Sequence, residues 1–211
     1  MRPVYMTISG SPRKDGCSAR MLRQFRQAIE AAGDAEFIHY DAYDSAFAPC
    51  TDCRACRQVE GCVMDDMDGF FADFEAADGI IIASPVYNMS FPAPMKAIID
   101  RMQRYYSARF FLGKRPPIAR HRPVALLLSA GSDQENGDFA AMQLEKIFTV
   151  TNCELCCRVT CSGTDRLDTD TDADADTERL ITRKAAAFAA ESAIGGIFRT
   201  IHHITKASQK N

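Results

Sequence analysis

Short apolar runs alternate along the chain with longer segments in which apolar residues recur every three or four positions. The short runs predict strands over residues 4–9, 35–40, 79–84, 123–129 and 155–161. The longer segments predict helices over residues 21–32, 66–77, 93–106, 139–150 and 178–192. Strands that alternate with helices indicate βαβ units with right-handed crossovers, and therefore a parallel sheet.

The pattern favours one α/β domain in a chain of 211 residues. Residues 79–84 are apolar almost throughout, which is typical of a strand buried on both faces of a parallel sheet. Five strands predict a flavodoxin-like fold, a three-layer α/β/α sandwich with a five-stranded parallel sheet, in which ligands bind beyond the carboxyl ends of the strands. We expect a single domain over residues 1–195. Residues 196–211 form a basic tail with an apolar side, which could be helical and dock on a partner subunit.

Composition narrows the class of protein. The formal charge of −3 predicts neither a nucleic-acid nor an anionic-membrane partner. No run approaches the roughly 18 apolar residues of a membrane span, and the N-terminus lacks the pattern of a secretory signal. We therefore expect a cytoplasmic protein, in which clustered cysteines are more often metal ligands or redox thiols than disulfides.

The segment 9–18, Ser-Gly-Ser-Pro-Arg-Lys-Asp-Gly-Cys-Ser, lies between the first strand and the first helix. Its small and hydroxylated residues allow backbone amides and hydroxyls to surround a phosphate, with the guanidinium of Arg13 as a further donor. It is neither a Walker A loop nor a Gly-x-Gly-x-x-Gly dinucleotide site, which favours a mononucleotide. The alternative is an ordinary turn in which Ser18 caps the helix.

This segment resembles the Gly-Ser-Pro-Arg-x-x-Gly-x-[Ser/Thr] motif of the NADPH-dependent FMN reductase and iron-sulfur flavoprotein family. The resemblance implies that the FMN phosphate is bound around Ser9, Ser11, Pro12, Arg13, Gly16, Cys17 and Ser18. The family usually has asparagine at the position of Cys17, so the contact there reduces to a backbone amide.

A second match covers residues 84–101 and is similar to the family's Ser-Pro-x-Tyr and Lys-x-x-x-Asp-Arg segments. It implies that one edge of the isoalloxazine is lined by Pro85, Val86, Tyr87 and Asn88. A weaker match after the fourth strand adds Ala130 and Gly131. Alternatively, Tyr87 is a core aromatic residue.

The charged residues of the second match read as a solvated face of the helix over residues 93–106. They are Lys96, Asp100 and Arg101, and an Asp–Arg bond would there be structural. Lys96 and Asp100 are four residues apart, which is the spacing of a helical ion pair.

Four cysteines, Cys50, Cys53, Cys56 and Cys62, follow the second strand with the spacing C-x2-C-x2-C-x5-C. A compact set of thiolates is suited to an iron-sulfur cluster or a zinc ion. Zinc is less favoured, because structural zinc sites usually divide their cysteines into two separated pairs. The iron-sulfur flavoproteins carry a compact motif of this kind that binds a 4Fe-4S cluster. The alternatives are a structural loop framework and free or redox-active thiols.

Three further groups of residues are weaker candidates. Cys153, Cys156, Cys157 and Cys161 fall in a predicted strand, whose extended geometry spreads the sulfurs, and we interpret them as core residues. The alternating aspartates of residues 164–177 read as a solvated acidic loop, since they lack calcium-loop spacing. The aromatic run Tyr105, Tyr106, Phe110 and Phe111 could cover the flavin or a neighbouring subunit, or could pack in the core or a dimer interface.

The resemblance implies an FMN-binding oxidoreductase that passes electrons from NAD(P)H through the flavin to a quinone, free flavin or another acceptor. Because the cofactor carries the chemistry, no acid–base residue is assigned, and Tyr87 and Asn88 are the nearest ring-edge candidates. One alternative is an iron-sulfur flavoprotein that carries electrons with a ferredoxin-like partner. Another is a thiol-based sensor. The family suggests a homodimer or homotetramer.

Overall fold

The computed structural model describes residues 2–131, 134–164 and 175–208, without the side chains of residues 134, 175 and 193–208. Most of the acidic run, residues 165–174, lies outside this part of the chain. The docking of the basic tail on a partner stays a prediction, because its side chains also lie outside the described ones.

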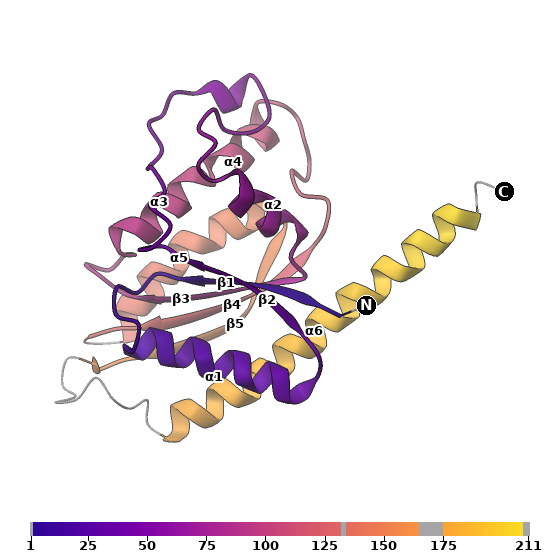
Figure 1. The fold of residues 1–211 in the computed structure, drawn as a ribbon. Helices are drawn as coiled ribbons and strands as arrows, with labels where there is room; N and C mark the ends of the chain where they lie inside the picture. Colours follow the sequence, from indigo (N-terminus) through magenta and orange to yellow (C-terminus); the bar gives the residue numbers. More distant parts are fainter. Residues whose placement is uncertain (1, 132–133, 165–174, 209–211) are drawn as a thin grey trace.

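The centre of the fold is a five-stranded parallel sheet in the order β2-β1-β3-β4-β5 (Figure 1). The strands are β1 (Val4–Ser9), β2 (Glu36–Asp41), β3 (Gly79–Pro85), β4 (Arg122–Ser129) and β5 (Cys153–Cys161). The helices are α1 (Cys17–Ala32), α2 (Asp68–Ala76), α3 (Ala93–Arg101), α4 (Gln103–Phe110), α5 (Gln134–Val150) and α6 (Ala175–Ser208), and a short 3₁₀ turn, η1, spans Ala55–Arg57. This order and the two helical layers confirm the predicted flavodoxin-like fold.

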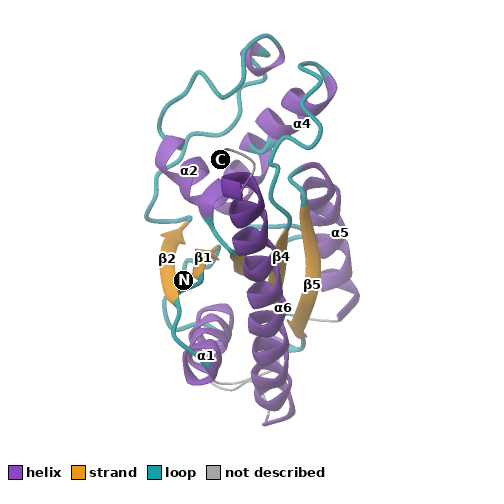
Figure 2. Cartoon of the chain, turned by 90° about the vertical axis from the view of Figure 1, so that its right-hand side faces the viewer, coloured by secondary structure: helices purple, strands orange, loops and turns teal. Residues whose placement is uncertain are grey.

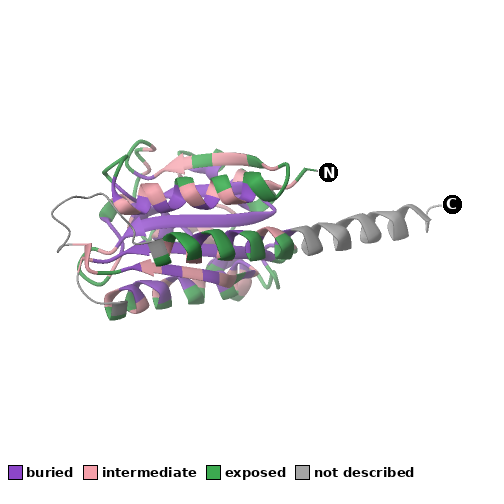
Figure 3. Ribbon diagram, turned by 90° about the horizontal axis from the view of Figure 1, so that it is seen from below, coloured by how far each residue is buried: buried purple, intermediate pink, exposed green. Residues whose placement is uncertain are grey.

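Each face of the sheet buries its own hydrophobic cluster. Alternate strand residues such as Met6 and Ile80 pack against α2, α3, α4 and α5. The intervening residues, among them Tyr5 and Ile81, pack against α1 and α6, which lie side by side on the other face (Figure 2). Buried positions accordingly concentrate in the central strands and on the inner sides of these helices (Figure 3). The apolar run of β3 is buried along its whole length, as its sequence predicts.

The observed helices differ from the predicted ones in their bounds, most of all α6, which continues to Ser208 instead of ending at residue 192. The helix predicted over residues 93–106 is interrupted at Met102, whose ψ of −9° ends α3 and starts α4. Apolar periodicity continues through this point, because both helices bury one side in the same core, so periodicity alone does not detect the interruption. Helix α5 starts at Gln134 rather than at Phe139, since its first turn is polar and carries no apolar repeat.

The last strand corrects a second expectation. Alternation of Leu155, Cys157, Val159 and Cys161 predicts that all four residues share one face. The pairing with β4 shifts between Val124 and Ala125, so Cys156 is the extra residue of a β-bulge. Leu155 therefore packs with the α5 side, whereas Cys157, Val159 and Cys161 pack with α1 and α6.

Helix α6 packs its first half against the start of β3, through Phe188 and Ser192. Within the described residues, none of the helices combines the length and the apolar character needed to cross a membrane.

We predict that Gly79→Ala destabilises the protein. A Cβ at Gly79 would lie 2.8 Å from Cζ of Phe188 and 3.2 Å from Oγ of Ser192, so the strand and the helix would have to separate. Overpacking of this kind costs about 1–3 kcal/mol of unfolding free energy, measurable by urea denaturation. Gly33→Ala is the matched control, because nothing lies within 4 Å of the added methyl group. Equal stability of the two variants would contradict this packing of α6.

Candidate functional site

Three loops meet at the point in the sheet where the order in which strands are added reverses. From β1 the chain passes to β2 on one side, and from β2 it returns to β3 on the other side of β1. The carboxyl ends of β1, β3 and β4 lie at one edge of the sheet, at the left of Figure 1, and ligands of open α/β sheets bind in such a crevice. The loops that follow these strands carry the residues expected to bind FMN.

Hydrogen bonds join these three loops. The N–H of Gly10 donates to the carbonyl of Ala83 at 2.8 Å, and the N–H of Val86 donates to the carbonyl of Ser129 at 2.8 Å. The buried hydroxyls of Ser18 and Ser129 lie 2.6 Å apart. The structure thus brings the sequence-predicted residues of all three loops to the same edge.

The first loop forms a turn that is closed by the hydroxyl of Ser11. The hydroxyl of Ser11 accepts a hydrogen bond from the N–H of Arg13 at 3.2 Å and donates to the carbonyl of Arg13 at 3.1 Å. Ser9, Ser11, Gly16 and Ser18 are buried, Cys17 is half-buried, and Pro12 and Arg13 are exposed. The turn leads into the N-terminus of α1, which favours negative charge.

The alternative role of Ser18 as a helix cap is wrong. The residue that caps α1 is Gly16, which has no side chain to offer, and the hydroxyl of Ser18 points to Ser129 instead. The first turn of α1 is described in full and carries no acidic residue that would repel an anion.

Gly10 allows the first loop to approach β3. A Cβ at this position would lie 2.7 Å from Oγ of Ser84 and 3.2 Å from Cβ of Met95. Only a residue without a side chain fits there, so the phosphate-loop candidate and the ring-edge candidate come within contact distance of each other.

The segment after β2 also belongs to this edge and was missed by the sequence reasoning. Lys14 in the first loop donates to the carboxylates of Asp41 at 2.7 Å and Asp44 at 2.6 Å, and these two bonds raise the pKa of Lys14. In the sequence, Tyr43 lies between these two aspartates, and its side chain is 38% exposed. Its partial burial raises its pKa, and nearby Tyr87 raises it further. The signal was available, because Asp41 is at the carboxyl end of a predicted parallel strand.

The second loop forms a tight two-residue turn. Tyr87 and Ser90 exchange both backbone hydrogen bonds at 2.9 Å, with Asn88 and Met89 at φ values of 51° and 60°. Positive φ at both central positions defines the type I′ hairpin turn. Gln143 of α5 fixes the turn, since it accepts from the hydroxyl of Ser90 at 3.0 Å and donates to the carbonyl of Met89 at 3.2 Å.

This turn holds Tyr87 outside the core. Its side chain is 41% exposed, which contradicts the alternative that it is a core aromatic residue. Pro85 is buried and Val86 is half-buried, so the loop offers backbone groups and one aromatic ring to the crevice. In the third loop, Ala130 is buried and Gly131 is half-buried.

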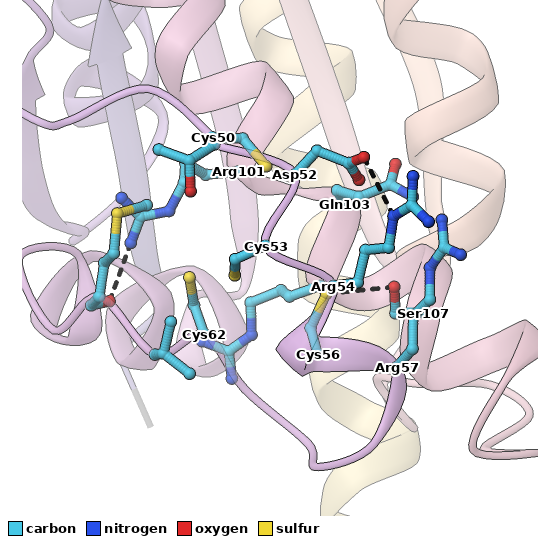
Figure 4. Close-up of a pocket in the computed structure, with 14 residues that line it drawn as sticks. Cys50, Asp52, Cys53, Arg54, Cys56, Arg57, Cys62, Arg101, Gln103 and Ser107 are labelled. Atoms are coloured by element: carbon cyan, nitrogen blue, oxygen red, sulfur yellow. Dashed lines mark hydrogen bonds and ion pairs between the residues drawn. The ribbon is translucent and has the colours of Figure 1, made fainter.

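The four cysteines of the loop after β2 line a single cavity of about 30 Å³ (Figure 4). Cys50 and Cys53 are exposed, and Cys56 and Cys62 are half-buried. The thiol of Cys56 donates to the hydroxyl of Ser107 on α4 at 3.2 Å. The sequence therefore identified a set of thiols that the fold does bring together.

Four arginines, Arg54, Arg57, Arg101 and Arg104, are among the residues that line the same cavity. Arg54 pairs with Asp52 at 3.2 Å, and Arg57 lies 4.6 Å from the ring centroid of Phe111. The donor set and the charge around it therefore fit a negatively charged iron-sulfur cluster.

The arrangement does not resemble a single-metal site. Among the described residues, no three His, Cys, Asp or Glu side chains come together as one metal ion would require. A 4Fe-4S cluster makes a different demand, because each thiolate binds a separate iron and the sulfurs stand farther apart than around one zinc ion.

Arg101 corrects the expectation of a solvated charged face. The Lys96–Asp100 ion pair is present at the surface of α3, whereas the side chain of Arg101 is only 1% exposed. Its guanidinium pairs with Asp66 at 2.9 Å, and burial of the guanidinium follows from the closing of the cysteine loop over the end of α3. Burial raises the pKa of Asp66, but the bonds from Arg101 and Ala48 outweigh it and lower this pKa overall.

The second group of cysteines belongs to the core. Cys153, Cys157 and Cys161 are buried in β5, and Cys156 is half-buried at the bulge. Burial raises the pKa of Cys157 to about 11 and that of Cys156 to about 12. Such thiols are mostly protonated at neutral pH and are poor ligands and nucleophiles.

The aromatic run of α4 is divided. Tyr105 is buried against Phe71 and Phe74, whereas Tyr106, Phe110 and Phe111 are exposed beside the cysteine loop. Only Tyr105 is therefore a core residue, and a role of the other three at a subunit contact stays a prediction.

The strand order and the loops at the carboxyl ends of β1, β3 and β4 define a flavodoxin-like protein. The chain belongs to the NADPH-dependent FMN reductase family, whose family model matches residues 5–155. This membership makes it an FMN-dependent oxidoreductase by class.

Relatives and solved structures agree with this assignment. An iron-sulfur flavoprotein of Methanosarcina thermophila is 35% identical over 140 residues, which cover 64% of this chain and 67% of the relative. The matched part spans 49% to 67% of the length of this relative and of two further iron-sulfur flavoproteins, from Methanocaldococcus jannaschii and Archaeoglobus fulgidus.

Two solved structures share the fold. The azoreductase of Bacillus anthracis str. Sterne has a TM-score of 0.65 at 14% identity, covering 90% of this chain and 99% of that one. An FMN-dependent NADH-azoreductase of Bacillus anthracis str. Ames Ancestor, in complex with FMN, has a TM-score of 0.60 at 13% identity and covers 90% and 98%.

The two groups of cysteines should differ in reactivity. With iodoacetamide on metal-free protein at pH 8, we expect Cys50 and Cys53 to be alkylated first, because they are exposed. Cys156 and Cys157 should react only after addition of denaturant, because their raised pKa values keep them protonated. Peptide mass spectrometry over time measures both rates. Labelling of Cys157 in the folded protein at the rate of Cys53 would show that β5 is not packed as described.

Proposed function

We propose that this protein transfers electrons from NAD(P)H through FMN to a quinone, free flavin or another acceptor. The observation that carries the proposal is the meeting of the three loops at the switch point between β1 and β3. Family membership supports the same conclusion.

In this proposal the first loop binds the FMN phosphate. Hydroxyls of Ser9, Ser11 and Ser18, backbone amides from Gly16 and Cys17, and the guanidinium of Arg13 would be the donors, with Pro12 shaping the turn. The hydroxyl of Ser11 would exchange its bond to the carbonyl of Arg13 for one to the phosphate. The tight turn around Ser11 and the helix N-terminus behind it favour an anion of this size. Lys14 is not assigned as a donor, because Asp41 and Asp44 bind two of its three N–H groups.

The second and third loops position the ring. Pro85, Val86, Tyr87 and Asn88 would meet one edge of the isoalloxazine with backbone groups and an aromatic side chain. Ala130 and Gly131 would allow close backbone approach on another edge. When bound, the flavin supplies the hydride chemistry, and the chain supplies orientation, hydrogen bonds and exclusion of water.

The cysteine loop would bind a 4Fe-4S cluster through Cys50, Cys53, Cys56 and Cys62. Support comes from the shared cavity, the four surrounding arginines and the iron-sulfur flavoproteins among the relatives. The protein would act as a homodimer or homotetramer, for which the exposed Tyr106, Phe110 and Phe111 are contact candidates.

One specific observation favours a second function, electron carriage with a ferredoxin-like partner. Helix α3 starts next to the ring-edge loop and ends at Arg101 in the cysteine cavity. Its nine residues span about 14 Å, so both candidate redox sites lie at the two ends of one short helix. A cluster there could divide two-electron flavin chemistry into single-electron steps.

Removal of phosphate donors should weaken FMN binding. Ser11→Ala and Arg13→Ala each remove one donor to the charged phosphate, and each should cost about 1.5–3 kcal/mol, or roughly 10- to 150-fold in Kd. Quenching of FMN fluorescence measures the affinity. Lys14→Ala serves as control and should bind FMN normally, because Lys14 is engaged with Asp41 and Asp44. Wild-type affinity in both donor variants would refute this placement.

Steady-state turnover distinguishes the two functions. If the protein is a reductase, FMN-loaded protein should oxidise NADPH or NADH when a quinone or excess FMN is added, at a rate proportional to enzyme. An electron carrier would show no turnover with either nucleotide but would be reduced by a ferredoxin, and that result would remove the reductase proposal.

A further inference from the structure

We infer that Arg101 is a positioning residue that closes the cysteine loop and holds its four thiols around one cavity. The inference goes beyond the flavin site. Of the two tests below, only the measurement of iron content depends on the proposed cluster.

The contacts of Arg101 join the two ends of the loop. One guanidinium nitrogen donates to the carbonyl of Ala48 at 3.0 Å, and the other donates to the carbonyl of Met64 at 2.9 Å. These carbonyls lie two residues before Cys50 and two residues after Cys62. We call Ala48, Met64, Asp66 and Arg101 the neck of the cysteine loop.

Asp66 completes the neck. One of its carboxylate oxygens pairs with Arg101 at 2.9 Å, and the other accepts the N–H of Ala48 at 2.8 Å. A single ion pair therefore binds the backbone on both sides of the loop. The planar guanidinium is suited to this task, because it presents several donors in a fixed fork, whereas a lysine offers a single point charge.

The loop beyond the neck needs such a fixed base. Its backbone has positive φ at Asp52 and Arg54, a conformation that non-glycine residues rarely adopt. Cys50 and Cys53 are exposed, so little core packing holds the loop. The neck, centred on the buried Arg101, is thus the part of the loop with the strongest anchors, and Arg101 also lines the cavity.

Arg104 provides a matched control. It lines the same cavity, and its guanidinium stacks on Phe71 at 4.4 Å, with Glu75 at 3.8 Å, rather than binding the neck. Arg104→Gln removes the same charge as Arg101→Gln from the same cavity. Any difference between the two variants therefore reports the bonds of the neck.

The first test is limited proteolysis with trypsin, which can cut the loop after Arg54 and Arg57. Cleavage of a locally opened loop follows the population of the open form. Arg101→Gln and Arg101→Lys should each accelerate loop cleavage by at least roughly tenfold for the loss of hydrogen bonds to a charged group. Arg104→Gln should cleave at nearly the wild-type rate, and FMN affinity should be unchanged in all three.

The second test is iron content after anaerobic reconstitution with iron and sulfide. Arg101→Gln and Arg101→Lys should incorporate less iron than Arg104→Gln. If the wild type takes up no iron while loop cleavage still accelerates, the positioning role stands and the cluster proposal fails.

Asp66→Asn keeps the test decisive if the Arg101 variants do not fold, because the side chain of Asp66 is partly exposed. It should accelerate loop cleavage relative to Arg104→Gln with unchanged FMN affinity. Equal loop cleavage in the Arg101 and Arg104 variants would overturn the inference. So would cleavage that spreads over the whole chain at one rate, because Arg101 would then only stabilise the fold.

Discussion

The adjacency of β1 and β3 is the constraint on which the candidate site depends. Both strands are parallel, and their crossovers leave to opposite sides, so the loops at their carboxyl ends must face each other across a crevice. Gly10 allows these two loops to come into contact, because a methyl group at this position would clash with the side chain of Ser84. The bond between Ser18 and Ser129 then fixes the third loop to the start of α1. The meeting of the three loops is therefore a consequence of strand order and a few short contacts.

The cysteine cavity, in contrast, does not depend on the order of the strands. It contains no strand end, and its loop rests on α4 and on the end of α3 (Figure 4). Burial of the Arg101 guanidinium costs desolvation, and its bonds to Asp66 and to the carbonyls of Ala48 and Met64 offset this cost. Helix α3 runs from the ring-edge loop to this cavity, so the same element contributes to both candidate sites.

Much of the fold could be predicted from the sequence, because strand and helix periods are local properties. The order of strands followed from such patterns, and the family motifs pointed to loops that the fold does bring together, after β1, β3 and β4. The features that the sequence did not reveal depend on tertiary contacts. The bulge at Cys156 reverses the faces of β5, and the break at Met102 divides a helix that reads as continuous. Burial of Arg101 depends on a partner 35 residues earlier, Asp66, which no local pattern reveals.

The most direct measurement of the central claim is a crystal structure of the protein saturated with FMN. We predict the phosphate within hydrogen-bond distance of Ser11 and the N-terminus of α1, with the isoalloxazine against residues 85–88. A flavin bound away from the switch point between β1 and β3, or a crevice that stays empty at saturating FMN, would contradict the account.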